Sequence, residues 1–184
     1  MPTYPNVTVD QMELTPCIVK FKKPGDLTYT DLGGTLDNVK VAVQYMKSPI
    51  KADQFGQTDL NSKVSGFACT VETAIAEVKD LELLKVIFPH ATLVGTSPNF
   101  ALDFKTQIGD DDLTNAGGLL LHPQSAGDTD ESHDFLFFKA TATAQSEYVF
   151  SPTEQTKMKI VWKIYPDTSV TPAKFLRYGD KDIV

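Results

Sequence analysis

Two short acidic runs, at positions 110–112 and 128–134, carry the carboxylate and hydroxyl oxygens that a calcium ion prefers. A calcium loop of the EF-hand type needs oxygen ligands at alternate positions, a glycine at position six and a glutamate at position twelve. Counted from the first aspartate of each run, position six is Asn115 in one and His133 in the other, and neither run has a glutamate at position twelve. We therefore interpret both runs as solvated loops.

Histidines and candidate nucleophiles do not form a recognisable set either. His90, His122 and His133 lie far apart, and the chain has no His-x-x-x-His or Cys-x-x-Cys pair of the kind that binds zinc. Around Ser97 the sequence departs from a nucleophile elbow, because Asn99 stands where the second glycine is required. No glycine-rich nucleotide-binding pattern occurs. The sequence thus predicts that the protein is not an enzyme and has no catalytic residue, cofactor or metal.

The charge of the chain narrows the class of partner. The 184 residues carry a net charge of −7, and 41% of them are hydrophobic, which predicts one globular domain with a substantial core. An acidic surface repels nucleic-acid phosphates. The negative charge therefore disfavours a DNA-binding protein and favours a protein past which DNA must move without binding. Solubility alone would also explain the charge.

The cysteines and the start of the chain bear on its compartment. Cys17 and Cys69 are too few for a disulfide framework, so we expect both to be reduced, buried thiols. The first residues, Met-Pro-Thr-Tyr-Pro-Asn, lack the basic and apolar regions of a signal peptide. No apolar run approaches the roughly 20 residues that a membrane helix needs. We expect a protein that is made in a cytoplasm and does not span a membrane.

The elements that would position these side chains are mostly strands. Residues 39–46 and a second run from Val64 alternate between apolar and polar side chains, which predicts two half-buried strands. The stretch 48–63 between them is longer than a tight hairpin loop, and long loops of this kind are functional or mobile. The face expected to pack on the core carries Val39, Val41, Val43, Tyr45, Phe67, Cys69, Val71, Thr73 and Ile75.

One helix stands out among the remaining elements. It is predicted just before Pro89, with Asp80 as its N-cap and with Leu81, Leu84 and Phe88 on one face. Seven or eight short strands with one helix argue for a mainly β fold, a β-sandwich or partly closed barrel with a flanking α-helix. An extended arm is expected at 1–12, and further strands at 14–21, 91–95, 101–108, 119–122, 134–143, 157–165 and within 174–180, with 134–143 and 157–165 forming a second hairpin.

Three segments in the first half of the chain resemble a known family. They are Asp-Leu-Gly-Gly at 31–34, Ala-Asp-Gln-Phe-Gly-Gln-Thr-Asp at 52–59, and Ala-Ile-Ala-Glu-Val-Lys-Asp-Leu-Glu-Leu-Leu at 74–84, followed by Phe-Pro. In this order they resemble the tail tube proteins of long-tailed bacteriophages. The chain departs from that pattern at Asp59, where the family often has proline, and at His90, where glycine is common.

The resemblance implies a single tail-tube-like domain and a structural role in the virion. Six subunits would form a ring, and stacked rings would form the hollow tube through which the genome is ejected. Partners would be other copies of the chain, the tape measure, tail terminator and distal tail proteins, and DNA only in transit. The resemblance implies that the bore is lined by Lys40, Gln44, Thr70, Glu72, Ala74 and Ala76, and that rings stack through Lys51, Asp53, Gln54, Phe55, Gln57 and Asp59.

Two alternatives remain open at this point. One is a monomeric β-sandwich that binds carbohydrate or peptide, which would present a concave patch of aromatic side chains. The other is a small hydrolase whose polar site the sequence pattern does not reveal. The aromatic residues available for a binding groove are Tyr29, Tyr45, Tyr148, Trp162 and Tyr165.

Overall fold

The computed structural model describes residues 15–104 and 108–180. Within them, strands dominate and one α-helix is present, which confirms the predicted mainly β class. The N-terminal arm expected at 1–12 lies outside the described residues. The elements are β1 Cys17–Lys22, β2 Thr30–Asp31, β3 Lys40–Ile50, β4 Asn61–Ile75, α1 Leu81–Ile87, β5 Ala91–Thr96, β6 Asn99–Phe104, β7 Gly117–Pro123, β8 Phe135–Val149, β9 Lys157–Tyr165 and β10 Leu176–Tyr178, with short 3-10 turns at Asp53–Phe55 and Gln124–Ala126.

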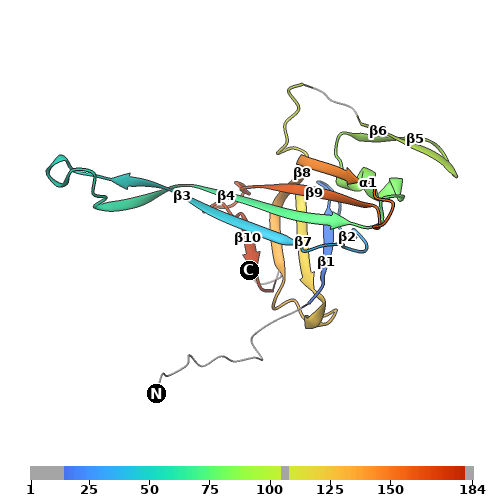
Figure 1. The fold of residues 1–184 in the computed structure, drawn as a ribbon, viewed down its shortest axis with the longest axis horizontal. Coiled ribbons are helices and arrows are strands. Elements are labelled where there is room, and N and C mark those ends of the chain that lie inside the picture. The colour runs from blue at the N-terminus through green and yellow to red at the C-terminus, as the bar shows by residue number, and fades with distance from the viewer. Residues whose placement is uncertain (1–14, 105–107, 181–184) are drawn as a thin grey trace, which may run out of the picture.

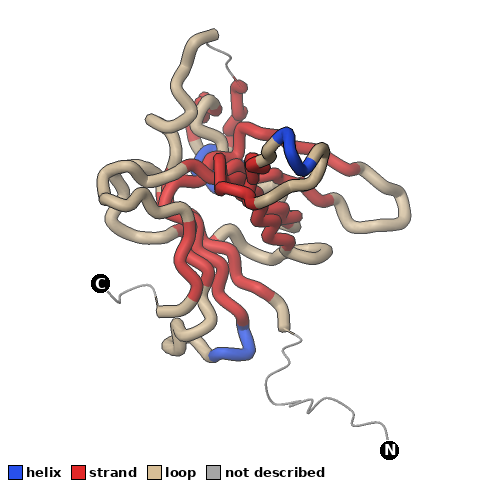
Figure 2. The backbone as a smooth tube through the Cα atoms, turned by 90° about the vertical axis from the view of Figure 1, so that its left-hand side faces the viewer, coloured by secondary structure: helices blue, strands red, loops and turns tan. Residues whose placement is uncertain are grey.

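Eight of the strands form one antiparallel sheet that is folded over on itself. Its order is β2-β1-β7-β8-β9-β4-β3, and β10 also pairs with β8. Strand β8 pairs with β7 and β10 over its first residues and with β9 from Lys139 onward, with a register shift between Thr141 and Gln145. Strands β1 and β7 run across the direction of β3, β4 and β9 (Figures 1 and 2). Strand β8 therefore passes from one layer to the other, as corner strands do in orthogonal sandwiches.

The core lies between these two layers. Phe21 of β1 and Trp162 of β9 meet there, with ring centroids 4.9 Å apart. Trp162 is completely buried, and its indole Nε1 donates a hydrogen bond of 2.9 Å to Oγ1 of Thr73. A buried indole needs such an acceptor, so this hydrogen bond lets the largest side chain occupy the centre of the core. The buried residues around it include Val19, Val71, Leu119, Phe137 and Ile160.

Helix α1 closes one end of the core and confirms the predicted helix and its N-cap, but the predicted face is only partly right, because Leu81 is half-buried whereas Leu83 and Ile87, which were not predicted, are buried. The side chain of Asp80 accepts hydrogen bonds of 3.0 Å from the backbone N–H groups of Glu82 and Leu83, so the helix begins at Leu81. The helix ends at Ile87, two residues before Pro89. On its inner face Leu83, Leu84 and Ile87 are buried.

The β3–β4 hairpin differs from its prediction in two ways. Its ladder runs from Lys40 opposite Glu72 to Ile50 opposite Asn61. The predicted loop 48–63 is therefore too long at both ends, because residues 48–50 and 61–63 belong to the strands. Polar residues extend the strands because the ladder needs only backbone N–H and C=O groups, and Pro49 is tolerated because β3 is an edge strand. The apolar face also does not stay on the core. Val43 and Tyr45, predicted to be buried, are 45% and 61% exposed, because the hairpin extends beyond the opposite layer (Figure 1).

The β5–β6 hairpin forms a small sheet of its own beside α1. The strand predicted at 101–108 begins earlier, at Asn99, and is described as far as Phe104. Residues 105–107 lie outside the described residues, and Ile108 is already in a turn and fully exposed. Ser97 lies in the turn between the two strands, as predicted.

Candidate assembly surface

The most distinctive surface is the outer part of the β3–β4 hairpin, residues 43–66, which we call the arm. It extends away from the rest of the molecule, to the left in Figure 1. Large apolar side chains on soluble monomers are exposed singly, whereas contiguous exposure marks a contact site. On the arm, the large apolar side chains that are between 39% and 63% exposed are Val43, Tyr45, Met46, Ile50, Phe55, Leu60 and Val64.

The six residues predicted for ring stacking all lie at the tip of the arm and are exposed. Lys51 Nζ lies 3.4 Å from Asp59 Oδ1 and donates a hydrogen bond of 3.4 Å to Gln57 Oε1. These contacts connect the two ends of the loop at the tip. Asp53 and Phe55 belong to the 3-10 turn, and Phe55 is 61% exposed. The structure thus brings the predicted set together at the point farthest from the core.

The backbone edge of the arm is a second feature suited to contact. Strand β3 is at the end of the sheet order, so within the described residues its outer edge has no neighbouring strand. An unpaired edge presents a row of N–H and C=O groups that can pair with another chain. The edge is long, because β3 has 11 residues.

The residues predicted to line a bore share one face of the same hairpin. Lys40 lies opposite Glu72 in the ladder, and Lys40 Nζ is 3.7 Å from Glu72 Oε2. Lys40, Gln44 and Glu72 are exposed, whereas Thr70 and Ala76 are half-buried. Ala74 does not fit the prediction, because it is only 4% exposed and has no surface to present to a bore. There the segment 34–36 runs beside β4 and hydrogen-bonds to it, through Leu36 N to Ala74 O and Ala76 N to Gly34 O.

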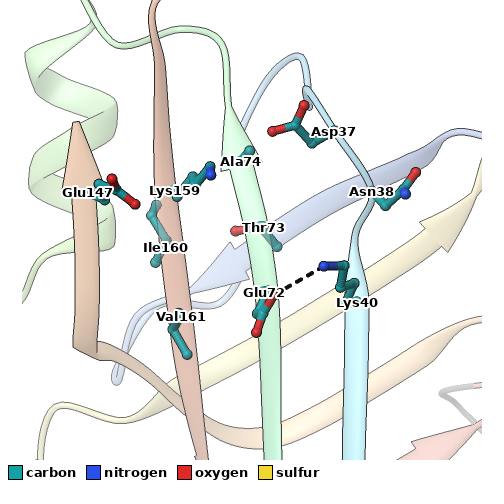
Figure 3. A pocket seen from close by; sticks show the side chains of 10 residues that line it. All are labelled: Asp37, Asn38, Lys40, Glu72, Thr73, Ala74, Glu147, Lys159, Ile160 and Val161. Atoms are coloured by element: carbon teal, nitrogen blue, oxygen red, sulfur yellow. Dashed lines mark ion pairs between the residues drawn. The ribbon is translucent and has the colours of Figure 1, made fainter. Parts of the chain in front are cut away.

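This face also forms a cleft of about 640 Å³ (Figure 3). Lysines and carboxylates alternate across it. One of the lining carboxylates, Asp37, pairs with Lys157: Lys157 Nζ is 2.7 Å from Asp37 Oδ2, and the hydrogen bond from Lys157 holds the pKa of Asp37 below its usual value. The lining residues are Asp37, Asn38, Lys40, Glu72, Thr73, Ala74, Glu147, Lys159, Ile160 and Val161. None is aromatic, so the cleft lacks the stacking platform expected of a sugar-binding groove.

The aromatic residues considered for such a groove are not brought together. Trp162 is in the core and Tyr45 is on the arm. Tyr148 donates a hydrogen bond from its hydroxyl to the carbonyl of Val78, and Tyr165 donates one to Asp112. These contacts place the rings on separate parts of the molecule.

One polar pair was not predicted from the sequence. His122 Nδ1 and Asp134 Oδ1 lie 2.6 Å apart, and both residues are buried, so the interpretation of Asp134 as part of a solvated loop is wrong. Twelve residues separate them, and only the antiparallel pairing of β7 with β8 brings them together. His122 Nε2 has no hydrogen-bond partner among the described residues, so no nucleophile completes the pair as a catalytic triad would require.

The remaining candidates for polar chemistry have local contacts. Asp110 pairs with His90 at 3.3 Å, and Asp111 accepts a hydrogen bond of 3.0 Å from the backbone N–H of Leu113. Burial raises the pKa of the Cys17 thiol, and that of the Cys69 thiol, to about 11. The described residues contain no group of three or more His, Cys, Asp or Glu side chains arranged to hold a metal ion.

Two further observations bear on the class of protein. In the part of the chain that the structure describes, no helix has both the length and the apolar character needed to cross a bilayer. Comparison of the sequence with protein-family models and with curated proteins finds no match in either set.

Proposed function

We propose that this chain is a structural virion protein, the repeating subunit of a phage tail tube. The observation that carries the proposal is the arm, with seven large exposed apolar side chains next to a strand edge that has no partner in the described part of the chain. Both features are costly on a protein that acts alone, and both become contacts when copies of the chain assemble. The resemblance of segments 31–34, 52–59 and 74–84 to tail tube proteins supplies the kind of assembly, stacked hexameric rings around a bore.

The face of the hairpin that carries Lys40 and Glu72 would line the bore in this assembly. Two of its lysines are paired within the chain, Lys40 with Glu72 and Lys157 with Asp37, and Glu147 adds a further carboxylate to the same face. Pairing of these lysines reduces the number of free cations available to DNA phosphates, which favours passage of a genome without tight binding. The tube would thus act as a conduit by keeping its bore open and weakly interacting. No chemical step is required.

Shortening the tip of the arm tests the proposal. Ile50 and Asn61 are paired, so residues 51–60 can be replaced by Asn-Gly, the usual two-residue hairpin turn. The shortened protein should remain a folded monomer, because the removed segment contains no buried residue. It should fail to form the rings or tubes expected of concentrated wild-type protein, as measured by light scattering and negative-stain microscopy.

A matched pair of point variants controls for the loss of any exposed apolar side chain. Phe55→Ser removes one from the tip of the arm, and Leu27→Ser removes one from the turn after β1, where Leu27 is 95% exposed. Only Phe55→Ser should weaken assembly. If the shortened protein polymerised like the wild type, the arm would have no role in stacking.

A further inference from the structure

The β3–β4 hairpin loses its neighbouring strand where the arm begins. Within the described residues, β9 pairs with β4 only from Cys69 to Ile75, so the hairpin has no third strand at Phe67 or farther toward the tip. From there it extends as the arm (Figure 1). A two-stranded ribbon is marginally stable and twists more than a wide sheet. The direction of the arm therefore depends on the contacts made at its base.

Three aromatic side chains lie in a row at this base. Tyr45 and Phe67 are opposite one another in the ladder, so they share a face, and their ring centroids are 5.1 Å apart at an interplanar angle of 73°. The ring of Phe67 also contacts that of Phe175, with centroids 4.4 Å apart. Such tilted and edge-on arrangements are favourable for aromatic pairs. The row links β3, through β4, to the segment just before β10.

The backbone around Phe175 is attached firmly to the packed layers. The carbonyl of Phe175 accepts a hydrogen bond of 3.2 Å from the backbone N–H of Phe138. Strand β10 begins at the next residue and pairs with β8, where Phe137 is completely buried. On the other side, Asp167 and Lys174 exchange backbone hydrogen bonds of 2.7 and 3.2 Å, which close the loop between them. The Phe175 ring is thus presented to the arm from a fixed position.

We propose that Phe175 is a positioning residue that fixes the direction of the arm. Its backbone belongs to the packed layers, and its ring contacts Phe67 at the point where the two-stranded ribbon begins. A fixed direction holds the exposed apolar side chains of the arm in place before contact, which reduces the conformational entropy lost when a second copy binds. The inference rests on the proposed self-assembly and names a residue on which its strength depends.

A distance measurement on dilute, monomeric protein tests the positioning role. Spin labels at Gln57→Cys, on the tip, and at Asp26→Cys, in the turn after β1, report the direction of the arm, because both positions are exposed. Cys69 is buried and Cys17 is half-buried, so the native thiols compete weakly for the label. With Phe175 intact, double electron–electron resonance should give a narrow distance distribution. Phe175→Ala should broaden it.

Three further variants serve as controls. Tyr178→Ala removes an aromatic contact from the same segment, because the ring of Tyr178 lies 4.5 Å from that of Phe135 on β8. Phe175→Tyr keeps the ring that contacts Phe67. Both variants should retain the narrow distribution. If Phe175→Ala does not fold by circular dichroism, Phe175→Leu removes the ring while keeping an apolar side chain, and it should give the broad distribution.

Assembly provides the second readout. Loss of one aromatic pair should raise the protein concentration that Phe175→Ala needs for assembly about tenfold. Tyr178→Ala should assemble within about threefold of the wild-type concentration. Broadening of the distribution with unchanged assembly would overturn the link between arm direction and contact.

The two readouts separate this inference from the proposed function. A distribution for Phe175→Ala that is as narrow as with Phe175 intact overturns the positioning role, whether or not the wild-type protein assembles. A broadened distribution in a protein that never assembles would support the positioning role and contradict the tail tube proposal.

Discussion

The two halves of the β3–β4 hairpin have the same kind of sequence and opposite environments. Near the body, meaning the two packed layers with α1, Val71 is completely buried and Cys69 nearly so. A few residues farther along the same strand, Val64 is 63% exposed. Alternation of apolar and polar side chains predicts which residues share a face, but the opposite layer determines whether that face is covered. Among the described residues, the body buries its own apolar core, whereas the large apolar side chains of the arm stay exposed.

The largest effect is expected in the body. Trp162→Ala removes a completely buried indole and the hydrogen bond to Thr73. It should lower the free energy of unfolding by roughly 3–5 kcal/mol, measured by urea denaturation of dilute, monomeric protein. Tyr45→Ala on the arm should cost the monomer less than about 1 kcal/mol. Similar costs for the two variants would show that the arm is as tightly packed as the body.

Cys69 probes the point where β4 passes from the arm to the body. Burial raises the pKa of its thiol from 9.0 to about 11, so the folded state keeps its proton longer than the unfolded state. The resulting stabilisation is fully present below pH 9 and is lost as the pH rises through about 11. Allowing for solvent screening, the loss is roughly 1–2 kcal/mol. Cys69→Ala should make the alkaline decline in stability shallower; an unchanged decline would mean that the thiol does not contribute to it.

The N-cap of α1 should give a smaller effect. Asp80→Ala leaves the backbone N–H groups of Glu82 and Leu83 without their acceptor and should destabilise the monomer by about 1 kcal/mol. Asp80→Asn keeps an acceptor oxygen and should recover most of the loss. Urea denaturation of both variants measures the difference, and equal stability of the two would contradict the assigned cap.

The smallest effect on folding is expected on the arm. Val64→Thr replaces an exposed apolar side chain with a polar one of similar shape and should change the free energy of unfolding of the monomer by no more than about 0.5 kcal/mol. The same variant should need a higher concentration than the wild type to assemble. If the variant were clearly destabilised as a monomer but assembled normally, Val64 would contribute to folding and not to assembly, contrary to the role assigned to the arm.

Much of the body could be predicted from local pattern. Alternation in β9 correctly indicates that every second residue faces the core, because successive side chains of a strand point to opposite faces of the sheet. These residues are Met158, Ile160, Trp162 and Ile164. The capped helix was predictable from Asp80 for a similar reason. The passage of β8 between layers was not, since a corner depends on the packing of distant strands. The burial of His122 with Asp134 and the low exposure of Ala74 also depend on segments that lie far away in the sequence.

Self-assembly of the unmodified chain is the property on which the proposed function depends. Negative-stain electron microscopy of purified protein, examined from dilute to concentrated solution with light scattering in parallel, measures it. We expect hollow rings at intermediate concentration and stacked rings or tubes at high concentration. A single monomeric species across the whole range, including in the presence of a tail initiator complex, would contradict the tail tube proposal and would favour a binding module that acts alone.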